Sequence, residues 1–128
     1  MKLTKETEQD IAQLQAYEQN LQQFLAQRQT LQMQQLEIEH ALGEIAATKD
    51  APFKVIGNVM VVTTKEKLQE ELTSKKERTA LRITTIESQE AKIKEKAEAL
   101  QQSIVRILRK EEGSHEKSTR DRGNIKRD

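Results

Sequence analysis

Residues 52–62 read Pro52-Phe53-Lys54-Val55-Ile56-Gly57-Asn58-Val59-Met60-Val61-Val62, and this segment has a different apolar period from the rest of the chain. It is rich in β-branched residues and follows the single proline of the sequence. Two short apolar runs separated by Gly57-Asn58 predict a β-hairpin at about residues 53–62, because glycine readily adopts the positive φ of a two-residue turn. The hairpin divides the chain into two long arms.

The arm before the hairpin, about residues 5–47, predicts one long helix. It holds 11 glutamines between Gln9 and Gln35, has no proline, and has no glycine before Gly43, a composition that favours helix. Mostly apolar residues recur at alternating steps of three and four, the spacing of a coiled-coil seam. These seam positions are Leu14, Tyr17, Leu21, Phe24, Arg28, Leu31, Gln35, Ile38, Leu42 and Ile45.

The arm after the hairpin repeats the pattern from about residue 64 to 110. Thr63 as the N-cap and Glu66 three residues later predict a capping box at its start. The seam continues through Thr79, Ile83, Ile86, Glu90, Ile93, Ala97, Leu100, Ile104 and Ile107. The fold class expected is therefore mainly α: an antiparallel two-helix coiled coil with one β-hairpin between the helices.

Composition supports narrow apolar stripes rather than one large core. Of 128 residues, 34% are hydrophobic and 34% charged, against roughly 45–50% and 25% in ordinary globular domains. These values exclude a compact globular enzyme, and the absence of cysteine excludes a disulfide scaffold. No apolar run is long enough for a membrane span, and the amino terminus lacks a secretion signal. We therefore expect a cytoplasmic protein with no membrane partner.

The charge balance of the two arms and the spacing of their seam residues together predict how the arms pair. Residues 1–50 carry 4 basic and 8 acidic side chains, whereas residues 51–108 carry 11 and 8, which favours pairing of the two arms. The expected register sets Leu14 against Leu100, Leu21 against Ile93, Leu31 against Ile83 and Leu42 against Leu72. It also places Gln35 opposite Thr79. Arg28 lies one layer from Glu90, where the two side chains either form an ion pair or extend to solvent.

The hairpin is expected to need a partner, because an isolated two-stranded ribbon is marginal in water. Hairpins from several subunits could join edge to edge into an intersubunit β-barrel. The residues assigned to oligomerisation are Phe53, Val55, Ile56, Val59, Met60, Val61 and Val62. The alternative is a hairpin that folds back over its own helices.

At this point the sequence resembles the β-type subunits of the prefoldin family. The resemblance rests on Phe53-Lys-Val-Ile-Gly-Asn-Val-Met-Val and the following Thr-Thr-Lys-Glu-Lys, midway between two heptad arms over about residues 8–108. It implies a hexamer of two α-type and four β-type subunits, with coiled coils extending from a double β-barrel. It further implies an ATP-independent holdase chaperone that binds unfolded proteins at the coiled-coil tips and passes them to a cytosolic group II chaperonin. A structural coiled-coil tether without client-holding activity is the alternative.

The register also predicts a client-binding patch at the end of the arms. Ile104 would face Asp10 and Ile107 would face Thr7, so the second helix stays apolar where the first has become polar. Incompletely covered apolar surface of this kind marks an interaction site. The residues of this predicted patch are Ile11, Leu14, Ile104, Val105, Ile107 and Leu108.

The sequence predicts neither catalytic activity nor a metal or cofactor site. No glycine-rich phosphate loop occurs, and His40 and His115 have no ligand set at metal spacing. We therefore predict no catalytic residue, metal or cofactor, and no enzyme. The helix–hairpin–helix domain is expected to span residues 1–110. The charged tail, 111–128, is expected to be disordered, and the near-balanced charge beyond Leu108 predicts no nucleic-acid partner.

Overall fold

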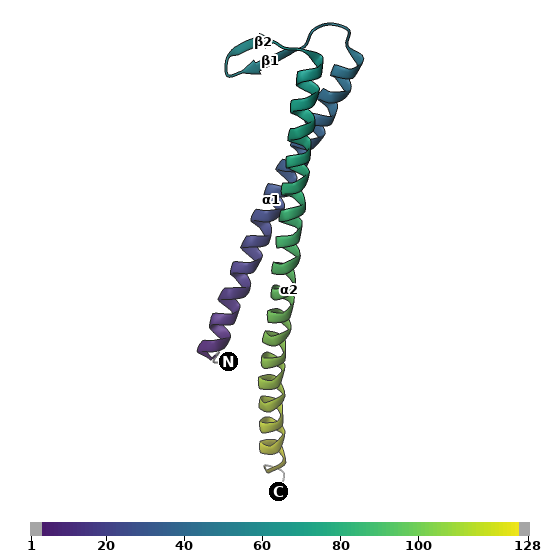
Figure 1. Ribbon diagram of the computed structural model, residues 1–128. Helices are drawn as coiled ribbons and strands as arrows, with labels where there is room; N and C mark the ends of the chain where they lie inside the picture. The colour runs from purple at the N-terminus through teal and green to yellow at the C-terminus, as the bar shows by residue number, and fades with distance from the viewer. Residues whose placement is uncertain (1–3, 126–128) are drawn as a thin grey trace. The chain divides into compact units, whose positions relative to one another are not determined.

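The computed structural model describes the backbone of residues 4–125 and the side chains of residues 4–112. The elements follow in the order α1 (Lys5–Ala47), β1 (Phe53–Ile56), β2 (Val59–Val62) and α2 (Lys65–Ile125) (Figure 1). The predicted fold class, two long helices joined by one antiparallel hairpin, is confirmed. The described chain forms two compact units. We call residues 23–90, which include the hairpin, the central unit, and residues 4–22 with 91–125 the terminal unit.

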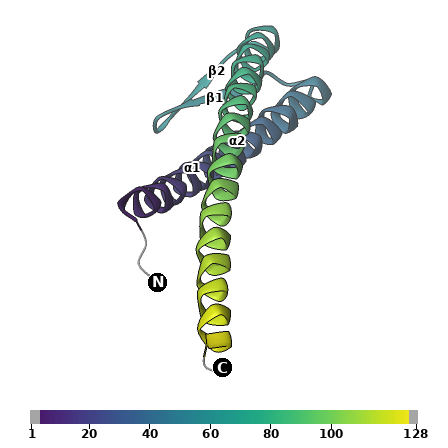
Figure 2. The same ribbon diagram turned by 90° about the horizontal axis from the view of Figure 1, so that it is seen from below.

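The hairpin has the predicted position and turn. Its register pairs Phe53 with Val62, Lys54 with Val61, Val55 with Met60 and Ile56 with Val59. Gly57 has a φ of 60° and is the one described residue with positive φ, the pattern of a type II′ turn with glycine in its first central position. In both views the turn end of the hairpin projects away from the helices of the central unit (Figures 1 and 2).

Side chains cap both ends of α1. At the amino end the Thr7 amide donates to Thr4 Oγ1 at 3.2 Å, which makes Thr4 the N-cap. At the carboxyl end the last turn has no basic residue of its own. Lys65 supplies the charge from the start of α2, where its Nζ donates to the carbonyl oxygens of Ala46 at 3.2 Å and Thr48 at 3.3 Å. A cation at this position complements the helix dipole.

The predicted capping box at the start of α2 is wrong by one residue. Thr64 is the N-cap, since its Oγ1 accepts from the amide of Lys67 at 3.2 Å. Thr63 instead extends the hairpin pairing beyond Val62, since its amide donates to the Pro52 carbonyl at 3.1 Å, and α2 begins two residues later at Lys65. The residue at the third helical position is then lysine, so no glutamate reaches back to the cap.

α2 continues as a helix to Ile125, beyond the end expected near residue 110, and the disorder of residues 111–128 stays a prediction. No proline interrupts residues 111–125, and their lysine, arginine and glutamate residues favour helix, whereas Gly113 and Gly123 disfavour it. Residues 126–128 of the predicted tail lie outside the described residues. The domain boundary at residue 110 stays a prediction.

The two-helix seam is confirmed at every predicted position. Each predicted seam residue is buried or half-buried, whereas most residues between them are exposed. The least exposed are Ile38, Ile45, Thr79, Ala97 and Ile104, all at 8% or below. Each unit therefore has a narrow apolar core that runs along facing stripes of α1 and α2, as expected for a coiled coil.

Candidate functional site

The hairpin is the largest exposed apolar feature of the described chain. All seven residues assigned to oligomerisation are exposed, from 42% for Val61 to 66% for Met60. A hairpin folded back over its own helices would have covered them, so that alternative is wrong. Monomeric soluble proteins rarely leave a contiguous apolar surface of this kind uncovered. The hairpin is therefore the surface at which a partner is most needed.

The strand register divides this surface into two faces, because residues directly opposite each other in an antiparallel pair point to the same side. We call the face made by Phe53, Val55, Met60 and Val62 the apolar face; these side chains are 57–66% exposed. The lysine face carries Lys54, Ile56, Val59 and Val61. The sheet has two strands, so the outer edge of each strand has no strand partner within the described chain. Unpaired edges next to apolar faces are templates for further strand pairing.

The lysine face is linked to α2. Lys54 Nζ donates to Glu71 Oε2 at 2.6 Å, with the two side chains 41% and 52% exposed. This ion pair ties β1 to the first turns of α2 within the central unit. The sequence prediction missed it, because the seventeen-residue separation follows neither the strand nor the helix period. The lone charged residue in an apolar strand was the available signal.

The seam contains one charged layer, and here the structure resolves the predicted alternative. Arg28 Nε donates to Glu90 Oε1 at 2.7 Å and Arg28 Nη2 to Glu90 Oε2 at 3.4 Å, so the two residues form an ion pair. The hydrogen bond to Glu90 raises the pKa of Arg28 above its usual value. The neighbouring polar seam residue, Thr79, instead donates its hydroxyl to the Lys75 carbonyl of its own helix at 2.8 Å.

The residues predicted to bind clients lie together in the terminal unit, on both of its helices. Val105 is 38% exposed, and Ile11, Leu14, Ile107 and Leu108 are half-buried. The expectation of incomplete cover is wrong for Ile104, which is 6% exposed.

Ile104 is covered because the first turns of α1 still present a surface against which α2 can pack. Thr7 is only 2% exposed, and it can be buried because its hydroxyl lies 2.8 Å from the Thr4 hydroxyl and shares a hydrogen bond with it. A hydroxyl satisfied within its own helix lets threonine serve as a seam residue. Client binding by this patch stays a prediction.

The described residues offer little else for chemistry. Among them no group of three or more histidine, cysteine, aspartate or glutamate side chains could hold a metal ion. Within the same residues, neither α1 nor α2 has a stretch apolar enough to cross a bilayer. The fold and site thus define a class of protein: a two-helix coiled-coil subunit that presents an apolar hairpin without a strand partner.

Comparison with known proteins identifies the family. The prefoldin subunit family, Prefoldin_2, matches residues 8–111. The chain is 40% identical over 101 residues to prefoldin subunit beta of Pyrococcus abyssi, covering 77% of this chain and 86% of the relative. It is 35% identical over 105 residues to prefoldin subunit beta of Archaeoglobus fulgidus, covering 80% and 90%.

A solved structure also supports this family assignment. The crystal structure of the prefoldin beta subunit from Thermococcus strain KS-1 matches with a TM-score of 0.78 and 33% identity, over 84% of this chain and 96% of that one. The chain belongs to the prefoldin family of molecular chaperones.

Proposed function

We propose that the chain is a β-type subunit of an ATP-independent holdase chaperone, which binds non-native proteins and transfers them to a cytosolic group II chaperonin. The observation that carries this proposal is the exposed hairpin: seven apolar side chains and two strand edges that the described chain does not cover. Family membership supplies the chaperone role, and the hairpin supplies the means of joining several subunits.

Assembly follows from the chemistry of the two hairpin faces. Edge-to-edge pairing of hairpins from different subunits would satisfy the outer backbone groups, and closure into a β-barrel would remove the remaining edges. Apolar side chains of both faces, among them Phe53 and Met60 of the apolar face and Val59 of the lysine face, would then be covered by packing within the assembly. We propose a hexamer with α-type and other β-type prefoldin subunits. The Lys54–Glu71 pair would hold each coiled coil at a defined angle to the barrel.

Client binding is proposed at the ends of the coiled coils, in the terminal unit. Val105, Ile11, Leu14, Ile107 and Leu108 offer partly exposed apolar surface there, and Ile104 supports it from beneath. A patch of this size binds weakly. Six coiled coils around one cavity raise the effective concentration of neighbouring sites, so that several weak contacts together hold an unfolded chain.

The test is suppression of aggregation of a chemically denatured protein on dilution, followed by light scattering without nucleotide. The full-length chain assembled with α-type partner subunits should suppress aggregation at near-stoichiometric ratios. The matched control is the Val59→Asp variant, whose hairpin carries a charge and whose helices are expected to stay intact. Equal aggregation with and without the intact assembly would contradict the holdase proposal and favour a structural coiled coil.

A further inference from the structure

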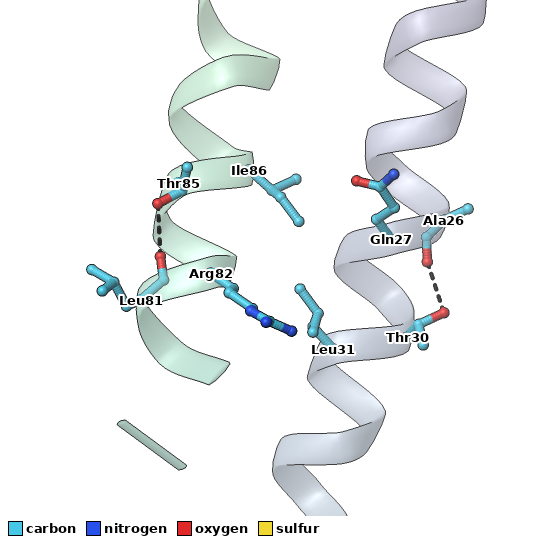
Figure 3. A pocket seen from close by; sticks show the side chains of 8 residues that line it. All are labelled: Ala26, Gln27, Thr30, Leu31, Leu81, Arg82, Thr85 and Ile86. Carbon is cyan, nitrogen blue, oxygen red and sulfur yellow. Dashed lines mark hydrogen bonds between the residues drawn. The ribbon is translucent and has the colours of Figure 1, made fainter. Parts of the chain in front are cut away.

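A groove of about 620 Å³ lies between α1 and α2 in the central unit, and none of the residues that line it is assigned to assembly or client binding. Its floor is formed by Leu31 of α1 and Ile86 of α2, which are half-buried seam residues. Figure 3 shows the two side chains pointing toward one another from facing helices. The groove therefore opens directly onto the apolar seam.

The walls of the groove are more apolar than their sequence indicates. Thr30 donates its hydroxyl to the Ala26 carbonyl at 3.0 Å, and Thr85 donates to the Leu81 carbonyl at 3.0 Å (Figure 3). Hydroxyl groups engaged with their own helix backbones leave the threonine methyl groups as the available surface. Leu81, on the outer edge of α2, is 68% exposed, more than any other large apolar side chain described.

Charge is distributed unevenly around this groove. None of the described residues that line it carries a carboxylate, although aspartate and glutamate make up 21 of the 128 residues. One cation does: Arg82 extends from α2 toward α1 and ends near Leu31 (Figure 3). Within the residues whose side chains are described, Arg82 forms no ion pair. The groove thus combines an apolar floor with the positive charge of Arg82, which has no counterion among the described side chains.

We propose that this groove is a second client-binding site, which binds an apolar segment of a non-native polypeptide that carries an aspartate or glutamate among its apolar residues. Apolar side chains of the segment would pack on Leu31, Ile86 and Leu81, and its carboxylate would pair with Arg82. The choice of occupant follows from charge complementarity, since a segment with a basic residue at that position would face Arg82. The inference rests on the proposed function only in that the occupant is a client.

The experiment measures binding of a short fluorescein-labelled peptide to the full-length chain by fluorescence anisotropy. The peptide contains several leucines and one central aspartate, and its counterpart has lysine in place of the aspartate. The aspartate peptide should bind about two- to fivefold more tightly, and Arg82→Gln should remove this preference. Leu81→Ser should weaken both peptides about three- to tenfold, since it removes apolar contact area.

Matched control variants distinguish binding in the groove from nonspecific binding to other exposed apolar side chains. Met33 and Leu36 are 65% and 61% exposed on α1 but do not line the groove, so Met33→Ser and Leu36→Ser should leave both affinities unchanged. Equal affinity for the two peptides, or equal loss in the control variants, would overturn the proposal. So would a fall in particle mass with Leu81→Asp, because a second copy would then occupy the groove.

The outcome also distinguishes this proposal from the proposed function. If the assembly protects a denatured protein from aggregation but the aspartate peptide does not bind, the proposal that the groove binds clients is wrong and the chaperone role stands. If the peptide binds with the expected preference but the assembly protects nothing, the holdase role is wrong, and the groove stands as a peptide-binding site whose occupant is not a client.

Discussion

The seam and the hairpin are both rich in apolar residues, yet they differ in what covers them. Along the seam every predicted position is buried or half-buried, with Ile38 at 5% exposure. In the hairpin Val59 is 60% exposed. The difference follows from the apolar pattern: a heptad stripe can be covered by a second stripe of the same chain. A run of consecutive apolar residues in a strand instead places apolar groups on both faces of the ribbon, because successive side chains point to opposite faces. The seam is completed within one chain, and the hairpin requires other chains.

The largest expected effect is the loss of assembly when a charge is placed in the hairpin. Replacing Val59 with Asp would bury a charge in any sheet formed with other subunits, which is strongly unfavourable. The assembly should dissociate toward single chains by multi-angle light scattering, while helicity by circular dichroism stays largely intact. Met33→Asp is the matched control, because Met33 is 65% exposed on α1. An unchanged particle mass for Val59→Asp would mean that assembly runs through the coiled coils.

The next largest effect is expected at the ends of the coiled coil. Truncation after Ala99 removes Ile104, Val105, Ile107 and Leu108 and should abolish protection of an aggregating client, while the assembly keeps its subunit count. Truncation after Glu112 is the control, since it removes the carboxyl-terminal part of α2 but leaves the predicted patch in place. Protection that survives the first truncation would place the main client site elsewhere in the assembly.

A series of alanine substitutions measures how completely the seam is covered, in the Val59→Asp background so that unfolding is not coupled to assembly. Ile38→Ala should cost about 2–5 kcal/mol, as expected for a buried aliphatic side chain. Leu31→Ala should cost about 1–2 kcal/mol, because Leu31 is half-buried and borders the groove. Leu36→Ala should stay within about 0.5 kcal/mol. Urea unfolding gives the order, and a reversed order of Ile38 and Leu36 would contradict the seam.

The regular parts of the molecule could be predicted from the sequence because the spacing of their apolar residues matches the period of a helix or a strand. Heptad spacing fixed α1 and the seam, and Gly57-Asn58 fixed the hairpin turn. The errors fall where single contacts decide. Thr63 extends the hairpin through its bond to Pro52, so that the cap falls on Thr64, and the hydroxyl of buried Thr7 is bonded to Thr4. A sequence pattern reports neither contact. Leu81 and Arg82 lie outside the heptad positions, so a seam analysis passes over the groove they form.

The smallest expected effect concerns the one described ion pair that joins the two regions, Lys54 with Glu71. Both side chains are about half exposed, so Lys54→Gln should change the stability of the unassembled chain by no more than about 1 kcal/mol. Its effect on assembly should be larger than its effect on stability, because each hairpin must meet its neighbours at a defined angle and the pair ties β1 to α2. Analytical ultracentrifugation should show a reduced fraction of full assemblies.

The charge-reversed double variant, Lys54→Glu with Glu71→Lys, should restore that fraction, since it keeps the pair and changes only its polarity. Lys65→Gln provides the contrast, because Lys65 caps α1 through backbone carbonyls and should lower stability without a specific loss of assembly. If Lys54→Gln and the double variant assemble equally poorly, the lysine acts through contacts with a neighbouring subunit and not through Glu71. If both assemble as well as the unmodified chain, the hairpin angle is set by the backbone at Pro52 and Thr63.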